Sequence, residues 1–209
     1  MTSSMHAWHR RSAAVIGLFA FFHIINHLVS LGGVEAHLHW MDAARRIYRQ
    51  PLVEAVLLAC VAFQIISGIG FVIRGWKARV GWLSWLQAAS GAYLALFLLA
   101  HVGAVLYGRV QLHLDTNFYF AAAGLYVPPW AWFFAPYYFL GVLALFTHLG
   151  CAACWQVRQR DVRRGALALG TACAAGAAIA LLIVLSLAGK IEAVEVPAKY
   201  MATYQAGTP

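Results

Sequence analysis

Five long apolar segments dominate the chain, and shorter polar segments separate them. At a rise of about 1.5 Å per residue, each is long enough as a helix to cross a hydrocarbon core of about 30 Å. The pattern therefore predicts an all-α integral membrane protein with a single membrane domain over residues 1–209. The five predicted spans lie at about residues 13–31, 52–73, 83–107, 130–155 and 166–187.

Composition excludes an ordinary soluble domain. Hydrophobic residues make up 63% of the 209 residues and charged residues 11%, whereas a soluble domain has about 25% charged residues. The first apolar segment follows Arg10 and Arg11, as in a signal peptide. It continues to His23, Asn26 and His27 without a small-residue cleavage site, so we expect it to remain in the mature protein.

The lysines and arginines set the expected orientation. Nine of the 15 lie at the N-terminus, between the second and third segments, or between the fourth and fifth, against six on the opposite side. Because cytoplasmic loops are enriched in these residues, we expect a cytoplasmic N-terminus and an external C-terminus. The net charge of +8 suits anionic membrane lipids and an acidic face of a cytoplasmic partner, and it needs no nucleic acid.

Two of the predicted helices carry the same pattern and end on histidine. Residues 12–23 read SAAVIGLFAFFH and residues 90–101 read SGAYLALFLLAH. A histidine within a membrane span is costly, and two at matched depth on repeated elements are expected to face one another across a shared group. Heme iron has two axial positions, so His23 and His101 are the candidate ligands of a heme b.

A second pair of polar positions lies deeper on the inner side. Gln64 precedes Arg74 by ten residues and His148 precedes Arg158 by ten, which places both about 15 Å from the same boundary. The first and third helices thus pair at one level and the second and fourth at another. This geometry predicts a four-helix bundle of two hairpins with ligand sites in its interior. His27 lies on the same helix face as His23, and for this residue a hydrogen bond to a neighbouring helix is favoured over a role as a ligand.

Four glycines within the predicted helices have two possible roles. They are either ordinary helix-packing residues or positions where a flat macrocycle approaches the backbone, and the sequence does not separate the two. These glycines are Gly17, Gly68, Gly91 and Gly141.

Short motifs in a fixed order extend over the first four predicted helices. They are Arg10-Arg11 ahead of Gly17-Leu18-Phe19 and His23; His39-Trp40-Met41-Asp42; Glu54 ahead of Gln64 and Gly68; Leu86-Gln87, Ser90-Gly91, Phe97 and His101-Val102; Asn117-Phe118; and Gly141-Val142-Leu143 with His148. In these motifs the chain resembles the cytochrome b membrane anchors of succinate dehydrogenases and fumarate reductases, of the five-helix, single-subunit type found in Bacillus. The resemblance covers about residues 8–155.

The resemblance implies a set of heme ligands. In that family, one histidine on each of the first four helices holds two hemes b. His23 and His101 match the ligands of the heme nearer the outside, and His148 matches one ligand of the inner heme, but Gln64 occupies the other position. A glutamine amide lacks the imidazole lone pair, so we expect one heme b, with a second left open. The alternatives for the inner site are a five-coordinate heme, a different ligand, or a quinone.

The resemblance also implies a function. The chain would be a non-catalytic electron-transfer subunit of a succinate:quinone oxidoreductase in the bacterial cytoplasmic (inner) membrane. It would relay electrons between a cytoplasmic iron–sulfur subunit, itself bound to a flavoprotein, and the quinone or menaquinone pool. Two other functions are compatible with the residues: a free-standing heme b protein that senses or carries heme, and an intramembrane zinc hydrolase using His27, His101 and His148.

Polar residues near the ends of the spans are candidates for supporting roles. Arg109 or His113 is expected to meet heme propionates on the outer side. Candidate proton donors to a quinone are Glu54 and Asp42 on the outer side and Arg10, Arg11 and Ser12 on the inner side.

Overall fold

The computed structural model describes residues 2–205, and all regular structure in this range is helical. The helices in chain order are α1 (Thr2–Val29), η1 (Ser30–Gly32), α2 (Val34–Tyr48), α3 (Pro51–Arg74), α4 (Trp82–Val110), α5 (Phe118–Ala122), η2 (Ala123–Leu125), α6 (Ala131–Arg158), α7 (Val162–Leu187) and α8 (Ala198–Gln205).

The number and order of the predicted membrane spans are confirmed. In the described part of the chain, the helices long and apolar enough to cross a membrane are Ser4–Gly32, Pro51–Arg74, Trp82–Val110, Ala131–Arg158 and Val162–Leu187. The protein is therefore a multi-pass membrane protein. The first helix begins well before the predicted bound near residue 13, because no glycine or proline interrupts residues 2–16. His6 and His9 therefore belong to α1.

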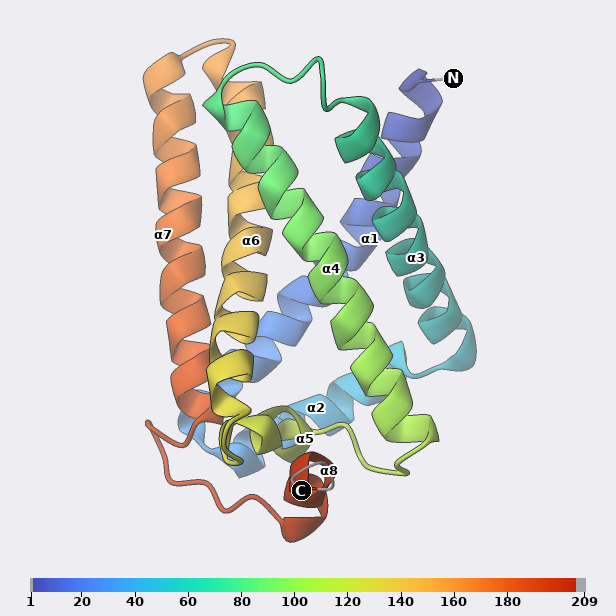
Figure 1. Cartoon of the computed structure of the whole chain (residues 1–209), viewed down its shortest axis with the longest axis vertical. Helices are drawn as coiled ribbons and strands as arrows, with labels where there is room; N and C mark the ends of the chain where they lie inside the picture. Colours follow the sequence, from blue (N-terminus) through green and yellow to red (C-terminus); the bar gives the residue numbers. More distant parts are fainter. Residues whose placement is uncertain (1, 206–209) are drawn as a thin grey trace.

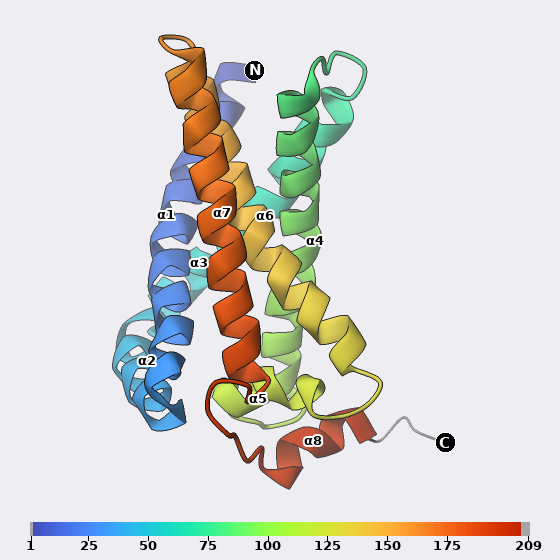
Figure 2. The same cartoon turned by 90° about the vertical axis from the view of Figure 1, so that its left-hand side faces the viewer.

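The five spanning helices run side by side, and the short helices gather at one end (Figures 1 and 2). We call this the capped end, formed by α2, α5, η2 and α8. The other is the open end, which holds the start of α1 and the α3–α4 and α6–α7 turns. The most extensive helix packing joins α6 to α7, followed by α4 to α6 and α1 to α3. Among the described residues, α1 packs mainly on α3 and α2, and not closely on α4 or α6.

The fully buried core lies toward the two ends. At the capped end, Phe118, Leu187 and Tyr200 pack together, and at the open end Cys151 and Cys154 pack against Leu83 and Leu169. Between these clusters many apolar side chains of the spans face outward. Leu18, Ile66 and Leu96 are 64%, 73% and 63% exposed, as expected where lipid rather than protein covers a helix.

The capped end contains more structure than the sequence pattern predicted. Residues 34–48, treated as part of a connection, form the amphipathic helix α2, whose His37 and Met41 are buried while its other face is charged. The expected ordered cap after the third span is present. Asn117 caps α5 by accepting a hydrogen bond from the Tyr119 backbone at 3.0 Å. Arg45 ties the two parts together through an ion pair with Asp115 at 2.8 Å.

Candidate functional site

The two histidines of the repeated pattern lie next to one another. α1 supplies His23 and α4 supplies His101, and the centroids of the two rings are 5.9 Å apart. The ring of His27 lies 4.8 Å from that of His23, and His37 of α2 lies 5.4 Å from His27. These four residues, the histidine cluster, bring three helices to one point beneath the cap.

The repeated pattern also places a phenylalanine on each of the two facing histidines. Phe19 stacks on His23 with ring centroids 5.5 Å apart, and Phe97 stacks on His101 at 5.2 Å, both nearly parallel. Each phenylalanine precedes its histidine by four residues, the spacing at which side chains meet on a helix. The stacking restricts the orientation of both imidazoles on their two helices.

A cavity of about 280 Å³ adjoins the histidine cluster. All four histidines line it, together with Ala100 and Ala104 of α4 and aromatic side chains of α5, α6 and α8. Apolar and aromatic walls with a few convergent polar groups are typical of cofactor sites. The lining of the cavity is therefore of the kind that a large apolar cofactor requires. Its volume is smaller than such a cofactor would occupy.

The spacing of His23 and His101 would allow the two rings to hold one iron atom between them. A metal–nitrogen bond of about 2.0–2.1 Å, plus roughly 1 Å from nitrogen to ring centroid, separates the centroids of two such imidazoles by about 6 Å. The observed value is 5.9 Å. In the described part of the chain neither ring forms a hydrogen bond to protein, so the ring nitrogens of both remain available. The donor set fits a heme b.

The other two histidines of the cluster differ from one another. The Nδ1 atom of His27 is buried without a hydrogen-bond partner among the described residues. His37 has partners on both sides. Its Nδ1–H donates to the Asn26 carbonyl at 2.8 Å, and its Nε2 accepts from the Asn26 side-chain amide at 3.3 Å. His37 is therefore held as a structural neutral imidazole. The sequence pattern did not single it out, because its segment was treated as a connection.

Acidification is expected to destabilise the protein through His37. Burial holds the pKa of His37 at about 4, below the ordinary value of 6.5, and nearby Arg45 acts in the same direction against the Asn26 hydrogen bond. Between these two pH values the unfolded chain binds a proton that the folded chain does not. Stability is therefore complete above pH 6.5 and falls as the pH drops toward 4, by about 3 kcal/mol in full. Thermal unfolding in detergent at pH 7 and pH 5 measures this loss.

The matched variants for that measurement lie on the same helix. His37→Gln is expected to show a smaller fall in melting temperature between pH 7 and pH 5 than the unsubstituted chain. His39→Gln alters an exposed histidine two residues away and is expected to keep the full fall. Equal falls in both variants would contradict the role of His37.

Gln64 and His148 are not brought together as a pair. Gln64 donates from its amide to the His9 carbonyl at 2.5 Å and to the Ser12 hydroxyl at 2.7 Å, so it ties α3 to α1. His148 has its Nδ1 3.1 Å from the Gln87 carbonyl and 3.3 Å from the Ser90 hydroxyl. The Gln64 amide is thus engaged with α1 instead of facing His148.

Arg109 is paired with a residue that was expected to act separately. It forms an ion pair with Glu54, in which its Nη1 contacts Oε1 and its Nη2 donates to Oε2 at 3.3 Å. The pair joins α3 to α4 near the capped end. Arg109 is therefore engaged with a carboxylate of the protein, and Glu54 with a guanidinium.

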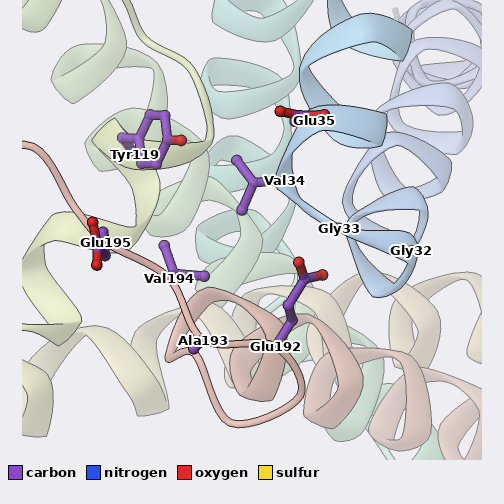
Figure 3. A pocket seen from close by; sticks show the side chains of 9 residues that line it. All are labelled: Gly32, Gly33, Val34, Glu35, Tyr119, Glu192, Ala193, Val194 and Glu195. Atoms are coloured by element: carbon purple, nitrogen blue, oxygen red, sulfur yellow. The ribbon is translucent and has the colours of Figure 1, made fainter.

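A second, more open pocket lies at the edge of the capped end (Figure 3). It measures about 380 Å³ and lies between the turn from α1 to α2 and the segment that follows α7. Glu35, Glu192 and Glu195 line it, with Tyr119 from α5. Its lining includes none of the four histidines, so it is separate from the cavity beneath the cap.

The described residues do not form a site for a bare metal ion. No group of three or more histidine, cysteine, aspartate or glutamate side chains in the described part of the chain has suitable geometry. His27 and His101 line the cavity, whereas His148 contacts Gln87 and Ser90 outside it. The ligand set of the zinc hydrolase alternative is therefore not assembled.

Comparison with known proteins yields one partial similarity. No protein-family model and no solved structure matches the chain. Over 87 residues, 41% of its length, the chain is 31% identical to the magnetosome protein MamZ of Paramagnetospirillum magneticum. The matched region covers 13% of MamZ, so the chain is similar to a small part of a much longer protein.

Proposed function

We propose that this chain is a membrane cytochrome b in which His23 and His101 hold one heme b from opposite sides. The observation that carries the proposal is the 5.9 Å separation of the two rings at the end of a repeated sequence pattern. The adjoining cavity supports it, as does the absence of hydrogen bonds from either ring to the residues that the structure describes. A heme b with two imidazole ligands supplies one-electron transfer, since no coordination position remains open for oxygen.

The protein's own residues prepare this site. Phe19 and Phe97 orient the two imidazoles by stacking, and aromatic side chains of α5, α6 and α8 give the cavity largely apolar walls. Both ring nitrogens of His37 hydrogen-bond to Asn26, which holds α2 over the histidine cluster. α1 and α4 hold the two imidazoles close together, which would reduce the ordering required when a heme binds.

The physiological role that we propose is the membrane anchor of a succinate:quinone oxidoreductase in the bacterial cytoplasmic membrane. In this role the chain relays electrons between a cytoplasmic iron–sulfur subunit, bound to a flavoprotein, and a quinone or menaquinone. The motifs over residues 8–155 support it, as does the set of five spans. The four-helix arrangement of α1, α3, α4 and α6 around the heme is part of the same proposal.

A free-standing heme b protein is the second candidate. It is favoured by Gln64, whose amide binds the His9 carbonyl and Ser12 and so does not act as the second inner ligand. A sensor or carrier of heme needs only the site beneath the cap, whereas a relay across the membrane is better served by two sites.

Two measurements on the detergent-purified full-length chain test the proposal. The dithionite-reduced minus oxidised spectrum is expected to show sharp heme b bands, with at least one heme per polypeptide. Purification from the native membrane is expected to bring down a flavoprotein and an iron–sulfur protein. A colourless preparation would contradict both proposed functions. A red preparation that lacks the flavoprotein and the iron–sulfur protein would favour the free-standing heme protein.

A further inference from the structure

The net positive charge of the chain lies at the open end. Within residues 2–205 this end carries nine basic side chains and one acidic side chain, Asp161, whereas the capped end carries six of each. Asp161 is itself paired with Arg164 at 3.2 Å. The whole net charge of +8 therefore lies at the start of α1 and around the α3–α4 and α6–α7 turns (Figure 1).

The α3–α4 turn combines this charge with exposed tryptophans. Its Arg74, Lys77 and Arg79 form no ion pair with any residue that the structure describes. The Arg79 guanidinium lies 5.1 Å from the ring centroid of Trp85 and 6.0 Å from that of Trp76. These two rings are in edge contact at 4.9 Å and are 40% and 57% exposed, respectively. We call these five residues the basic turn.

Arg79 has hydrogen-bonding capacity that the described residues do not use. Its Nη2 donates to the Val72 carbonyl at 3.3 Å. Its Nη1 is buried and has no hydrogen-bond partner among the described residues. A guanidinium carries five N–H donors and a permanent positive charge, and it matches carboxylate and phosphate oxygens in geometry. The basic turn is therefore a positively charged site without an anionic acceptor in the described part of the chain.

The place of the basic turn in the fold favours a lipid over an acidic protein. Arg74 is the last residue of the spanning helix α3, and Trp85 lies in the first turn of the spanning helix α4. Tryptophan and basic residues at the ends of spanning helices lie at the level of the lipid headgroups. Ile73 and Val80, on either side of the turn, are 68% and 82% exposed. A lipid supplies an anion and an apolar chain together, which matches both features.

We infer that the basic turn binds the headgroup phosphate of an anionic phospholipid in the adjoining leaflet. Arg79 binds the phosphate, and Arg74 and Lys77 add positive charge around it. Trp76 and Trp85 orient the guanidinium and contact the apolar part of the lipid. A zwitterionic lipid carries the same phosphate with a compensating cation, so the site selects by net charge. This inference goes beyond the proposed heme function and does not depend on it.

The test is the binding of phosphatidylglycerol and of phosphatidylcholine to the detergent-purified full-length chain. The two lipids are titrated separately, and binding is measured by native mass spectrometry. Each basic residue near an anionic surface contributes about fivefold to binding, so a preference for phosphatidylglycerol of more than about tenfold is expected. Arg79→Gln and Lys77→Gln should each lower this preference about fivefold. Lys77 is exposed, so its substitution is expected to leave the fold unchanged.

Arg160→Gln is the matched control. It removes the same charge from an exposed position on the other turn of the open end, and it is expected to keep the preference. Equal binding of the two lipids by the unsubstituted chain would overturn the inference. Equal losses in Lys77→Gln and Arg160→Gln would also overturn it, because net charge alone would then explain the preference. If Arg79→Gln loses a co-purifying protein but keeps the lipid preference, the basic turn is a protein-docking surface and the lipid site is wrong.

Discussion

Replacing His23 or His101 with alanine is expected to abolish binding of the proposed heme b beneath the cap. Each variant removes one of the two imidazoles that would hold the heme iron. Substitutions that only orient a metal ligand weaken binding about 10–100-fold, so loss of the ligand itself is expected to exceed that range. The measurements are heme per polypeptide after purification and the reduced minus oxidised spectrum. The two variants should lose the same spectral component.

His27→Ala is the control for this experiment. His27 shares a helix with His23, its ring contacts that of His23 at 4.8 Å, and it lines the same cavity. Its substitution removes a similar volume from the same place without removing a proposed ligand, so most of the low-spin spectrum should persist. If His27→Ala loses the heme and His23→Ala keeps it, the ligand assignment is wrong even though a heme is bound.

The spans could be predicted from the sequence because the thickness of the bilayer sets the length of an apolar run. Five spans were expected, and five helices in the described part of the chain are long and apolar enough to cross a membrane. The helix α2 was missed because the bilayer thickness does not set its length. It lies on the protein and not across the membrane, so its apolar residues occupy one face of a helix that also carries Arg45, Arg46 and Asp42. A search for long apolar runs does not register such a helix.

The site was predictable where the signal lay within one helix. The repeated spacing of phenylalanine and histidine identified His23 and His101, and the structure places these rings side by side. The expected pairing of Gln64 with His148 relied on equal distance from the membrane boundary. Depth alone does not fix which helix faces which, and the hydrogen bonds of Gln64 point to α1.

Gly141→Ala is expected to disturb the proposed heme site indirectly, through Phe97. A methyl group at Gly141 on α6 would overlap the ring of Phe97, which stacks on His101. Phe97 must then move, and His101 loses the surface that orients it. Overpacking of this kind costs about 1–3 kcal/mol. We expect a lower melting temperature, a reduced heme content and a broadened low-spin signal from the site beneath the cap.

Two variants decide whether this effect passes through Phe97. Gly103→Ala adds the same methyl group two residues from His101, where nothing lies within 4 Å, so it should leave the spectrum unchanged. Adding Phe97→Leu to Gly141→Ala removes the overlapping ring and should recover the melting temperature, because the packing conflict is relieved. The heme signal should recover only in part, since leucine cannot stack on His101. If the double variant fully recovers both the melting temperature and the heme signal, the volume at Gly141 and not stacking by Phe97 controls the position of His101. If Gly141→Ala alone has a normal spectrum, neither the volume at Gly141 nor the stacking controls it.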